Sequence, residues 1–368
     1  MGERQTRYPP AATPSSGTVR HYEYVFPDGA MYVYDIDHGF RLVRRVPLPG
    51  VKGVRGVAAS PRTRMLYVSY GAFGGPGTIG RLVAYNLLTG SVSYKRSFDF
   101  GVDNMAIDPA GRRIYMPDGE LSHDGVWNVI AARSGDVVGT INGGRGPHET
   151  IVSLNGKHVY LSGVNWPWLE VASTATDRVI KRIGPLRAGV RPTTINGRET
   201  IAYTTASGYL GFQVSSITTG RVLFTVGFGP QFRAIGHTLT PSHGISLTPN
   251  ERQLWVMDSP NGYVHVFDVS GVPQRGPARI AGIRLVHPLT GGSGWIQMGR
   301  DGCFVYIGDS GEVISTQSLR SIAFLPALRR TKESLEIDWR NGQPVATSTR
   351  TGLGYVTRGP DPSPPKCR

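Results

Sequence analysis

Ser242-His243-Gly244-Ile245-Ser246-Leu247-Thr248-Pro249 is followed by the turn residues Asn250-Glu251-Arg252 and by Gln253-Leu254-Trp255-Val256-Met257-Asp258. Both apolar runs are short, contain β-branched or aromatic residues and are bounded by turn residues, so this stretch predicts two strands joined by a tight turn. After Ser259-Pro260-Asn261-Gly262, the alternating run Tyr263-Val264-His265-Val266-Phe267-Asp268 predicts a third strand. Short turns between successive strands are typical of an antiparallel sheet.

The same pattern of strand, turn and strand occurs seven times along the chain. The copies begin near residues 55, 103, 148, 191, 243, 295 and 335. Their spacing of roughly 47 residues, with four strands in each unit, is typical of β-propeller blades. Each of the first six copies is followed by a second strand pair, which in the second copy covers residues 129–131 and 137–141.

The two ends of the chain are expected to share one blade. Only a Pro-rich tail follows the seventh copy, and a hairpin over residues 30–48 precedes the first copy without a strand pair of its own. We therefore predict an all-β, seven-bladed β-propeller whose last blade takes its inner strands from the C-terminus and its outer strands from the N-terminus. Such closure removes the free edges of a linear array. The expected boundaries are a flexible Pro-rich arm over 1–20, one propeller over 21–357 and a Pro-rich tail over 358–368.

The composition agrees with many short strands joined by turns. The 49 Gly and 27 Pro are dispersed along the 368 residues, unlike those of a disordered tract. The 40 Lys and Arg outnumber the 26 Asp and Glu, which gives a net charge of +14 without any long block of like charges. Such diffuse charge is either general surface character or an attraction for nucleic acid. No apolar run reaches the roughly 18 residues of a membrane span, and we expect a monomer.

The cysteines and the first residues leave the cellular compartment open. Cys303 lies in an apolar strand and Cys367 is the penultimate residue. A bridge between them would require the tail to fold back, so we expect two free thiols. Residues 1–20 contain no apolar segment of the kind found in a secretory signal peptide.

Two repeats carry a resemblance to a known family. Gly56-Val57-Ala58-Ala59-Ser60-Pro61 precedes Leu66-Tyr67-Val68-Ser69, and Ala106-Ile107-Asp108-Pro109-Ala110-Gly111 precedes Ile114-Tyr115-Met116. These units resemble the YVTN-type bacterial propellers, whose units read roughly Pro-x-Gly-Ile-Ala-x-Ser-Pro-Asp-Gly followed by Leu-Tyr-Val-Thr-Asn. The resemblance covers residues 30 to 350, implies a seven-bladed fold and a periplasmic or secreted location, and says little about function. A weaker resemblance, through Ser242-His243-Gly244-Ile245 and Pro147-His148-Glu149-Thr150, is to streptogramin-lyase-like propellers.

The start of each inner strand is the candidate site. Inner strands of a propeller line its central channel, so these positions should meet at one mouth, together with long connections such as that from Gly227 to Ser242. The position holds mostly polar residues in strands that are otherwise apolar: Arg55, Asp103, His148, Arg191, His243 and Trp295. Glu149, Trp166 and Trp168 lie nearby in the sequence and complete the candidate set.

Each candidate has a structural interpretation beside the functional one. His148 and His243 either bond to loops and water or act as general bases or metal ligands. With Asp103 they are candidate ligands for a divalent metal ion, the possible cofactor, although no short ligand spacing supports it. Arg55 and Arg191 either join blades or bind a carboxylate or phosphate. The indoles of Trp166 and Trp168 either cap a blade or stack on a ligand.

These residues and the net charge are compatible with two functions. The first is a propeller that binds a small polar or anionic molecule at the channel mouth and acts as a lyase or hydrolase, with His148 and His243 as bases or metal ligands. The second is a non-catalytic propeller that binds protein, glycan or nucleic acid through its basic surface. The sequence contains no nucleophile elbow, phosphate-binding loop or dinucleotide fingerprint. The fold alone does not choose between the two functions.

Overall fold

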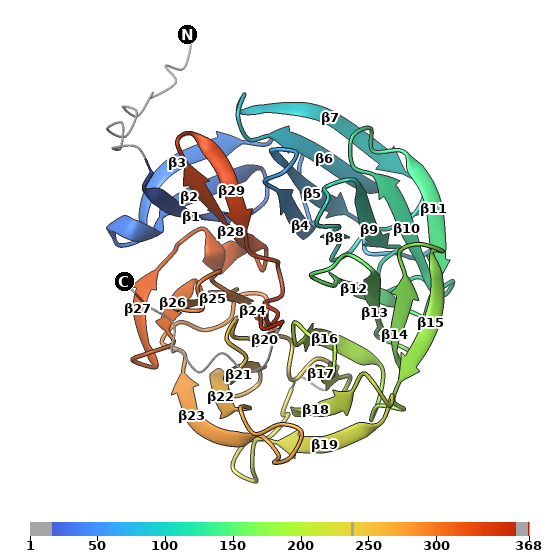
Figure 1. Ribbon diagram of the computed structural model, residues 1–368. Coiled ribbons are helices and arrows are strands. Elements are labelled where there is room, and N and C mark those ends of the chain that lie inside the picture. Colours follow the sequence, from blue (N-terminus) through green and yellow to red (C-terminus); the bar gives the residue numbers. More distant parts are fainter. Residues whose placement is uncertain (1–16, 237–238, 358–366, 368) are drawn as a thin grey trace.

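Seven antiparallel sheets surround a central axis in the computed structural model (Figure 1), which describes residues 17–236, 239–357 and 367. The predicted seven-bladed β-propeller is therefore confirmed. The expected arm over 1–20 and tail over 358–368 lie largely outside the described residues.

Blades 1 to 3 follow the sequence from the channel outward. They comprise β4 (Val54–Ser60), β5 (Met65–Gly71), β6 (Gly80–Asn86) and β7 (Ser91–Phe98); β8 (Ala106–Ile107), β9 (Arg113–Pro117), β10 (Val126–Ala131) and β11 (Val137–Asn142); and β12 (Pro147–Val152), β13 (His158–Gly163), β14 (Leu169–Ser173) and β15 (Arg178–Ile183).

Blades 4 to 6 repeat this order. They comprise β16 (Val190–Ile195), β17 (Ile201–Ala206), β18 (Gly211–Ser216) and β19 (Val222–Gly227); β20 (Ile245–Leu247), β21 (Gln253–Asp258), β22 (Tyr263–Asp268) and β23 (Ala278–Arg284); and β24 (Trp295–Met298), β25 (Phe304–Gly308), β26 (Glu312–Ser315) and β27 (Arg320–Phe324). Because successive strands are antiparallel, all inner strands begin at one end of the channel, which we call the mouth.

Blade 7 contains strands from both ends of the chain. Its order is β29 (Gln343–Thr347), β28 (Ser334–Arg340), β1 (Val19–Val25), β2 (Ala30–Asp35) and β3 (Arg41–Pro47). Two 3-10 turns, η1 (Ile36–His38) and η2 (Leu328–Arg330), flank these strands. The blue and red ends of the colour bar thus meet in one sheet in Figure 1.

As predicted, blade 7 combines strands from both ends of the chain, but the strands that each end contributes differ from the prediction. The hairpin β2–β3 supplies the outer pair, as expected, but the N-terminus also supplies β1, which pairs with β28 from Val19 and Arg340 to Val25 and Ser334. β29 lies on the channel side of β28 instead of between β28 and the outer pair. The pattern of β1 was obscured because it carries His21 and Glu23, which are nevertheless buried at 8% and 0% exposure.

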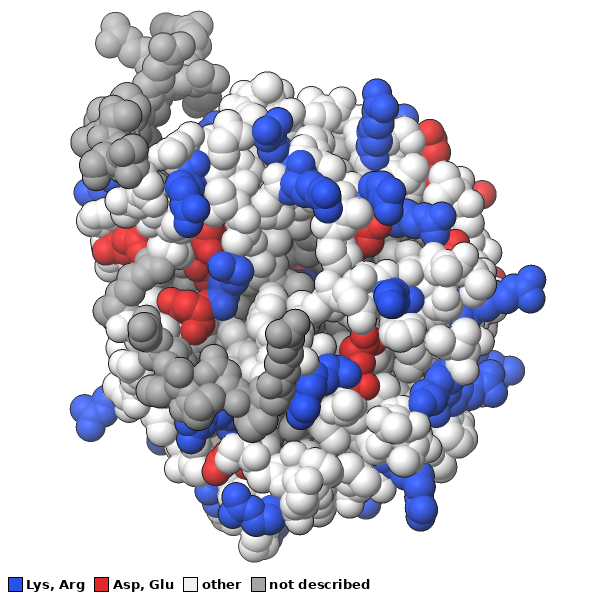
Figure 2. All heavy atoms as spheres, viewed as in Figure 1, with Lys and Arg blue, Asp and Glu red and all other residues white. Residues whose placement is uncertain are grey.

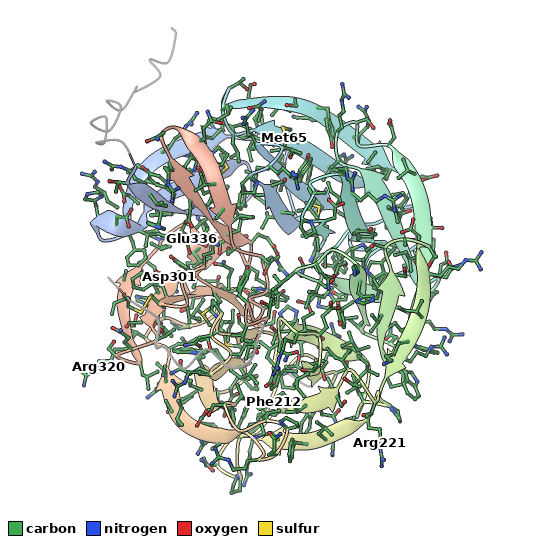
Figure 3. The ribbon with its side chains drawn as sticks, viewed as in Figure 1. Met65, Phe212, Arg221, Asp301, Arg320 and Glu336 are labelled. Carbon is green, nitrogen blue, oxygen red and sulfur yellow. A yellow bond between two sulfur atoms is a disulfide. The ribbon has the colours of Figure 1, made fainter. Side chains whose placement is uncertain are left out.

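Burial follows the position of each strand in its blade. The inner three strands are largely buried, and the outer strands expose half or more of their side chains, with strict alternation along β19. Apolar side chains fill the space between neighbouring blades, including the fully buried Trp127 and Trp255. The outer strands carry many of the basic residues, and Figure 3 shows Arg221 and Arg320 pointing away from the rim. In Figure 2, Lys and Arg are scattered around the face toward the viewer without forming one patch.

The chain enters the channel after β29. This channel segment, residues 348–356, bonds to three blades from inside the ring. The Gly354 N–H donates to Ile195 O and the Tyr355 N–H to Pro249 O, both at 2.9 Å, while the Thr351 hydroxyl donates to the Glu149 carboxylate. The segment therefore holds the inner ends of blades 3, 4 and 5 together.

The cysteines correct one expectation. Cys303 and Cys367 form a disulfide, with their Cα atoms 5.2 Å apart and a sequence separation of 64. The prediction of free thiols was wrong because residues 348–356 lead the chain through the channel to the turn before β25, which the sequence pattern did not reveal. No cysteine among the described residues is free.

Candidate functional site

The structure brings most of the predicted site residues together at the mouth. Asp103, His148, Arg191 and His243 are 6–8% exposed, Trp295 is 1% exposed and Glu149 is inaccessible. Each lies at or near the start of an inner strand, so closure of the ring brings them together at one end of the channel. Arg55, the second residue of β4, is partly exposed at the same end.

The two imidazole rings lie side by side with their Nδ1 atoms held from behind. Their centroids are 5.7 Å apart. His148 Nδ1 is 3.0 Å from the Asp103 carboxylate, and His243 Nδ1 is 2.9 Å from the carbonyl oxygen of Gly294. Both partners are acceptors, so each Nδ1 carries a proton and each Nε2 is left for another partner.

The environment keeps His243 neutral. Burial lowers the pKa of His243 well below 6.5, and the positive charge of Lys332 and the neighbouring His148 act in the same direction. The Nε2 atom of His148 is buried and has no hydrogen-bond partner among the described residues. The pair therefore presents one imidazole oriented by a carboxylate beside one held in its neutral form, an arrangement that suits proton transfer or acceptance of a hydrogen bond from a ligand.

The arginines differ in their partners. Arg191 donates to Glu120 at 2.9 Å and to the Ser207 hydroxyl at 3.0 Å, so it has the structural role considered for it, joining the loop of blade 2 to blade 4. Burial alone would raise the pKa of Glu120, but His148, Arg191 and Arg55 hold it below its usual value. Arg55 stacks on Phe73 with its guanidinium carbon 4.0 Å from the ring centroid, and its Nε has no partner in the described part of the chain.

Three important site residues were not found from the sequence. Arg350, from the channel segment, forms a two-pronged ion pair with Glu333 and stacks on Trp295. Lys332 lies 3.7 Å from the Asp309 carboxylate. The other residues were identified from their position at the start of the inner strand in each repeat. Arg350 follows the seventh copy, and Glu333 and Lys332 precede it, so none of the three occupies that position.

Glu149 faces the channel segment instead of the open mouth. Its carboxylate accepts hydrogen bonds from the Thr193 N–H and the Thr351 hydroxyl. Burial raises its pKa to about 7, against the lowering effect of these bonds and of His148. Glu149 is thus a structural link between blades 3 and 4 and residues 348–356.

Trp166 and Trp168 lie apart from the histidines. The Trp166 indole donates to Glu170 at 3.2 Å, and Arg182 of the outer strand covers its ring at 5.6 Å. Trp168 lies next to Gly184, after the outer strand. Trp295, by contrast, contacts the edge of the His243 ring at 5.3 Å.

Of the three proposed metal ligands, only the two imidazoles remain, because Asp103 is used elsewhere. Asp103 contacts Nδ1 of His148, behind the ring, where it orients the imidazole. Across residues 17–236, 239–357 and 367, no group of three or more His, Cys, Asp and Glu side chains is placed to hold a metal ion.

Comparison with known proteins supports the fold alone. No protein-family model matches the sequence, and no curated protein matches it either. The solved structure of hydrazine synthase from Kuenenia stuttgartiensis is similar, with a TM-score of 0.56 and 17% sequence identity over 83% of this chain and 88% of that chain. The YVTN-type resemblance therefore stays an expectation. In the described part of the chain, no helix is long and apolar enough to cross a membrane.

Proposed function

We propose that this propeller binds a small anionic molecule at the channel mouth, and that His148 and His243 contact its reacting or hydrogen-bonding groups. The observation that carries the proposal is the pair of imidazoles 5.7 Å apart, each with Nδ1 held by an acceptor and Nε2 left for another partner. The lone pair on Nε2 of the neutral His243 ring favours a ligand with a hydroxyl or N–H group, and His148 Nε2 offers a second contact beside it.

The charges at the mouth favour an anion. Most charged groups there are paired: Arg191 with Glu120, Lys332 with Asp309 and Arg350 with Glu333. Arg55 instead stacks on Phe73 and keeps donors for a carboxylate or phosphate. A hydroxy acid, with its hydroxyl at an imidazole and its carboxylate at Arg55, fits both features.

The same arrangement is suited to lyase or hydrolase chemistry. The Asp103–His148 pair orients one imidazole, which could then accept a proton from a substrate or from water. The neutral His243 and the cation of Arg55 would stabilise the negative charge that develops on the substrate.

The experiment is a binding and turnover test on matched variants. Isothermal titration with L-malate and inorganic phosphate should show saturable binding that is lost, by at least about tenfold, in Arg55→Ala and in His148→Ala/His243→Ala. His38→Ala is the matched control, because that histidine lies in η1 and pairs with Asp35 away from the mouth. The proposal would be contradicted if wild type and the double variant bound these probes with equal affinity and hydrolysed test esters at equal rates.

A second candidate is supported by the basic outer strands. Residues such as Arg44, Lys95 and Arg182 give the rim positive charge on several blades. A polyanion such as nucleic acid would bind to this rim without base-specific contacts, and its affinity would fall steeply with salt. Titration of a fluorescent oligonucleotide at 50 and 200 mM NaCl distinguishes this function, because malate at the buried mouth should respond far less to salt.

A further inference from the structure

The channel also contains a cavity that extends from beside the mouth residues toward the opposite end. Its volume is about 230 Å³, and its wall includes Ser60, Asp108 and Ser153, which end or follow the inner strands of blades 1 to 3. The mouth residues stand at the beginnings of the same strands, and the cavity reaches them: Asn104, which follows Asp103, donates its backbone N–H to His148 O at 3.2 Å. In Figure 2 this face of the molecule is hollowed near the ring axis.

Two residues of the wall have polar atoms without partners. Asn104 is 1% exposed, and both its amide oxygen and its amide nitrogen lack hydrogen-bond partners among the described residues. Arg350 uses Nε and Nη2 for Glu333, while its buried Nη1 has no partner in the described chain. Buried polar groups of folded proteins are nearly always paired, so these unpaired atoms of Asn104 and Arg350 at one cavity indicate a place for a polar ligand.

The rest of the wall combines apolar side chains with hydroxyl groups such as that of Thr150, and it carries no net charge. Met105, Ile107, Leu154 and Leu353 supply apolar surface. The charge of Arg350 is compensated by Glu333, and Arg62 and Asp108 contribute one charge of each sign. The volume far exceeds the roughly 10–15 Å³ that one water molecule needs, so the cavity has room for an organic molecule.

We propose that this cavity is a second binding site, for a small uncharged carboxamide with an apolar body. The ligand's amide N–H would donate to Asn104 Oδ1, and its carbonyl oxygen would accept from Asn104 Nδ2 or Arg350 Nη1. An acceptor and a donor in one planar group match the amide of Asn104, whereas a carboxylate offers acceptors only. The apolar body would lie against Ile107 and Leu353.

Benzamide is a suitable probe, with acetophenone and benzoate as analogues of similar shape that lack either the donor or the neutral charge. Titration monitored by ligand NMR should show saturable binding of benzamide to the wild-type protein, at least tenfold tighter than that of either analogue. This comparison needs no variant, so it tests the site even where a substitution impairs folding. Binding of all three probes with equal affinity, or of none, would overturn the proposal.

Asn104→Leu, which keeps the branched shape and the number of heavy atoms but has no polar atoms, should reduce benzamide affinity to that of acetophenone. His148→Ala/His243→Ala should leave benzamide binding unchanged, because neither imidazole is part of the cavity wall. A crystal grown with benzamide should show its amide at Asn104. Ordered water alone in the cavity, or unchanged benzamide affinity in a folded Asn104→Leu protein, would contradict the assignment.

Discussion

The guanidinium carbon of Arg350 lies 3.7 Å from the centre of the Trp295 ring, and the Trp295 indole N–H donates to the Arg350 carbonyl oxygen at 3.2 Å. The same guanidinium pairs with Glu333, and both charged side chains are nearly inaccessible, at 6% and 4% exposure. Arg350 thereby attaches the channel segment to blade 6 and to the loop that leads into blade 7.

Arg350→Ala should strongly destabilise the protein. Removal of one partner leaves Glu333 buried without its counter-charge, and such changes cost about 3–5 kcal/mol. Urea unfolding monitored by tryptophan fluorescence measures the loss. Arg320→Ala at the exposed end of β27 is the control and should change the stability by less than about 0.5 kcal/mol. A double variant that also replaces Glu333 by Leu should be less destabilised than the sum of the single variants, and simple additivity would contradict the pairing.

Glu149 should make stability depend on pH. Its pKa is raised from 4.5 to about 7 in the folded state, so the folded protein binds the proton more tightly than the unfolded chain. The resulting stability is complete below pH 4.5 and is lost as the pH rises through about 7. Glu149→Gln keeps an acceptor for Thr193 and removes the titration. Its melting temperature should fall less than that of wild type between pH 5 and pH 8, and parallel curves would show that Glu149 is not the titrating group.

The seam between the two ends of the chain should respond to pH in the same direction. Glu23 on β1 lies directly opposite Glu336 on β28, and burial raises the pKa of both well above 4.5. The nearby acids Asp338 and Asp301 add to the rise for Glu336, and Figure 3 shows Asp301 close to Glu336.

Glu23→Gln should therefore raise the melting temperature at pH 8 but not at pH 4.5, where the acid is already protonated. Asp136→Asn, whose side chain is 65% exposed on the rim, is the control. A loss of stability at pH 8 would mean that the ionised carboxylate is needed by the seam.

The disulfide should be detectable and stabilising. Cys303 and Cys367 close a long loop, for which the loss is about 2–4 kcal/mol when the bridge is removed. Thiol titration of the unfolded, unreduced chain should find no free thiol, and Cys303→Ser/Cys367→Ser should unfold at lower urea. Two titratable thiols would contradict the bridge. Disulfides persist mainly in oxidising compartments, so the bridge should be lost when the protein is kept in excess reductant.

The repeats predicted the ring because the pattern of each blade is local. A strand, a tight turn and a second strand can be identified from neighbouring residues, and the count of inner-strand starts located His148 and His243 without any structure. The same reasoning missed β1, where buried His21 and Glu23 break the apolar alternation.

The rest of the site depends on contacts between distant residues. Thr351 reaches Glu149 across 202 residues, and Arg350 belongs to a segment without strand periodicity. Nothing in the local pattern of residues 348–356 indicates that they enter the channel, so the pairing of Cys303 and Cys367 was also missed. Partners of this kind are visible only once the ring is closed.

The shared blade has a consequence for how the protein is made. Tyr24 on β1 and Trp339 on β28 bond side chain to side chain across 315 residues. At the ribosome's pace of about 5–20 residues per second, β1 waits roughly 15–60 s before its partner strand is synthesised. During that time blades 1 to 6 can form in order, whereas β1 has an unpaired edge that invites pairing with another nascent chain. The synthesis of β28 therefore acts as a check on completeness, because a product truncated before that strand keeps the edge of β1 open.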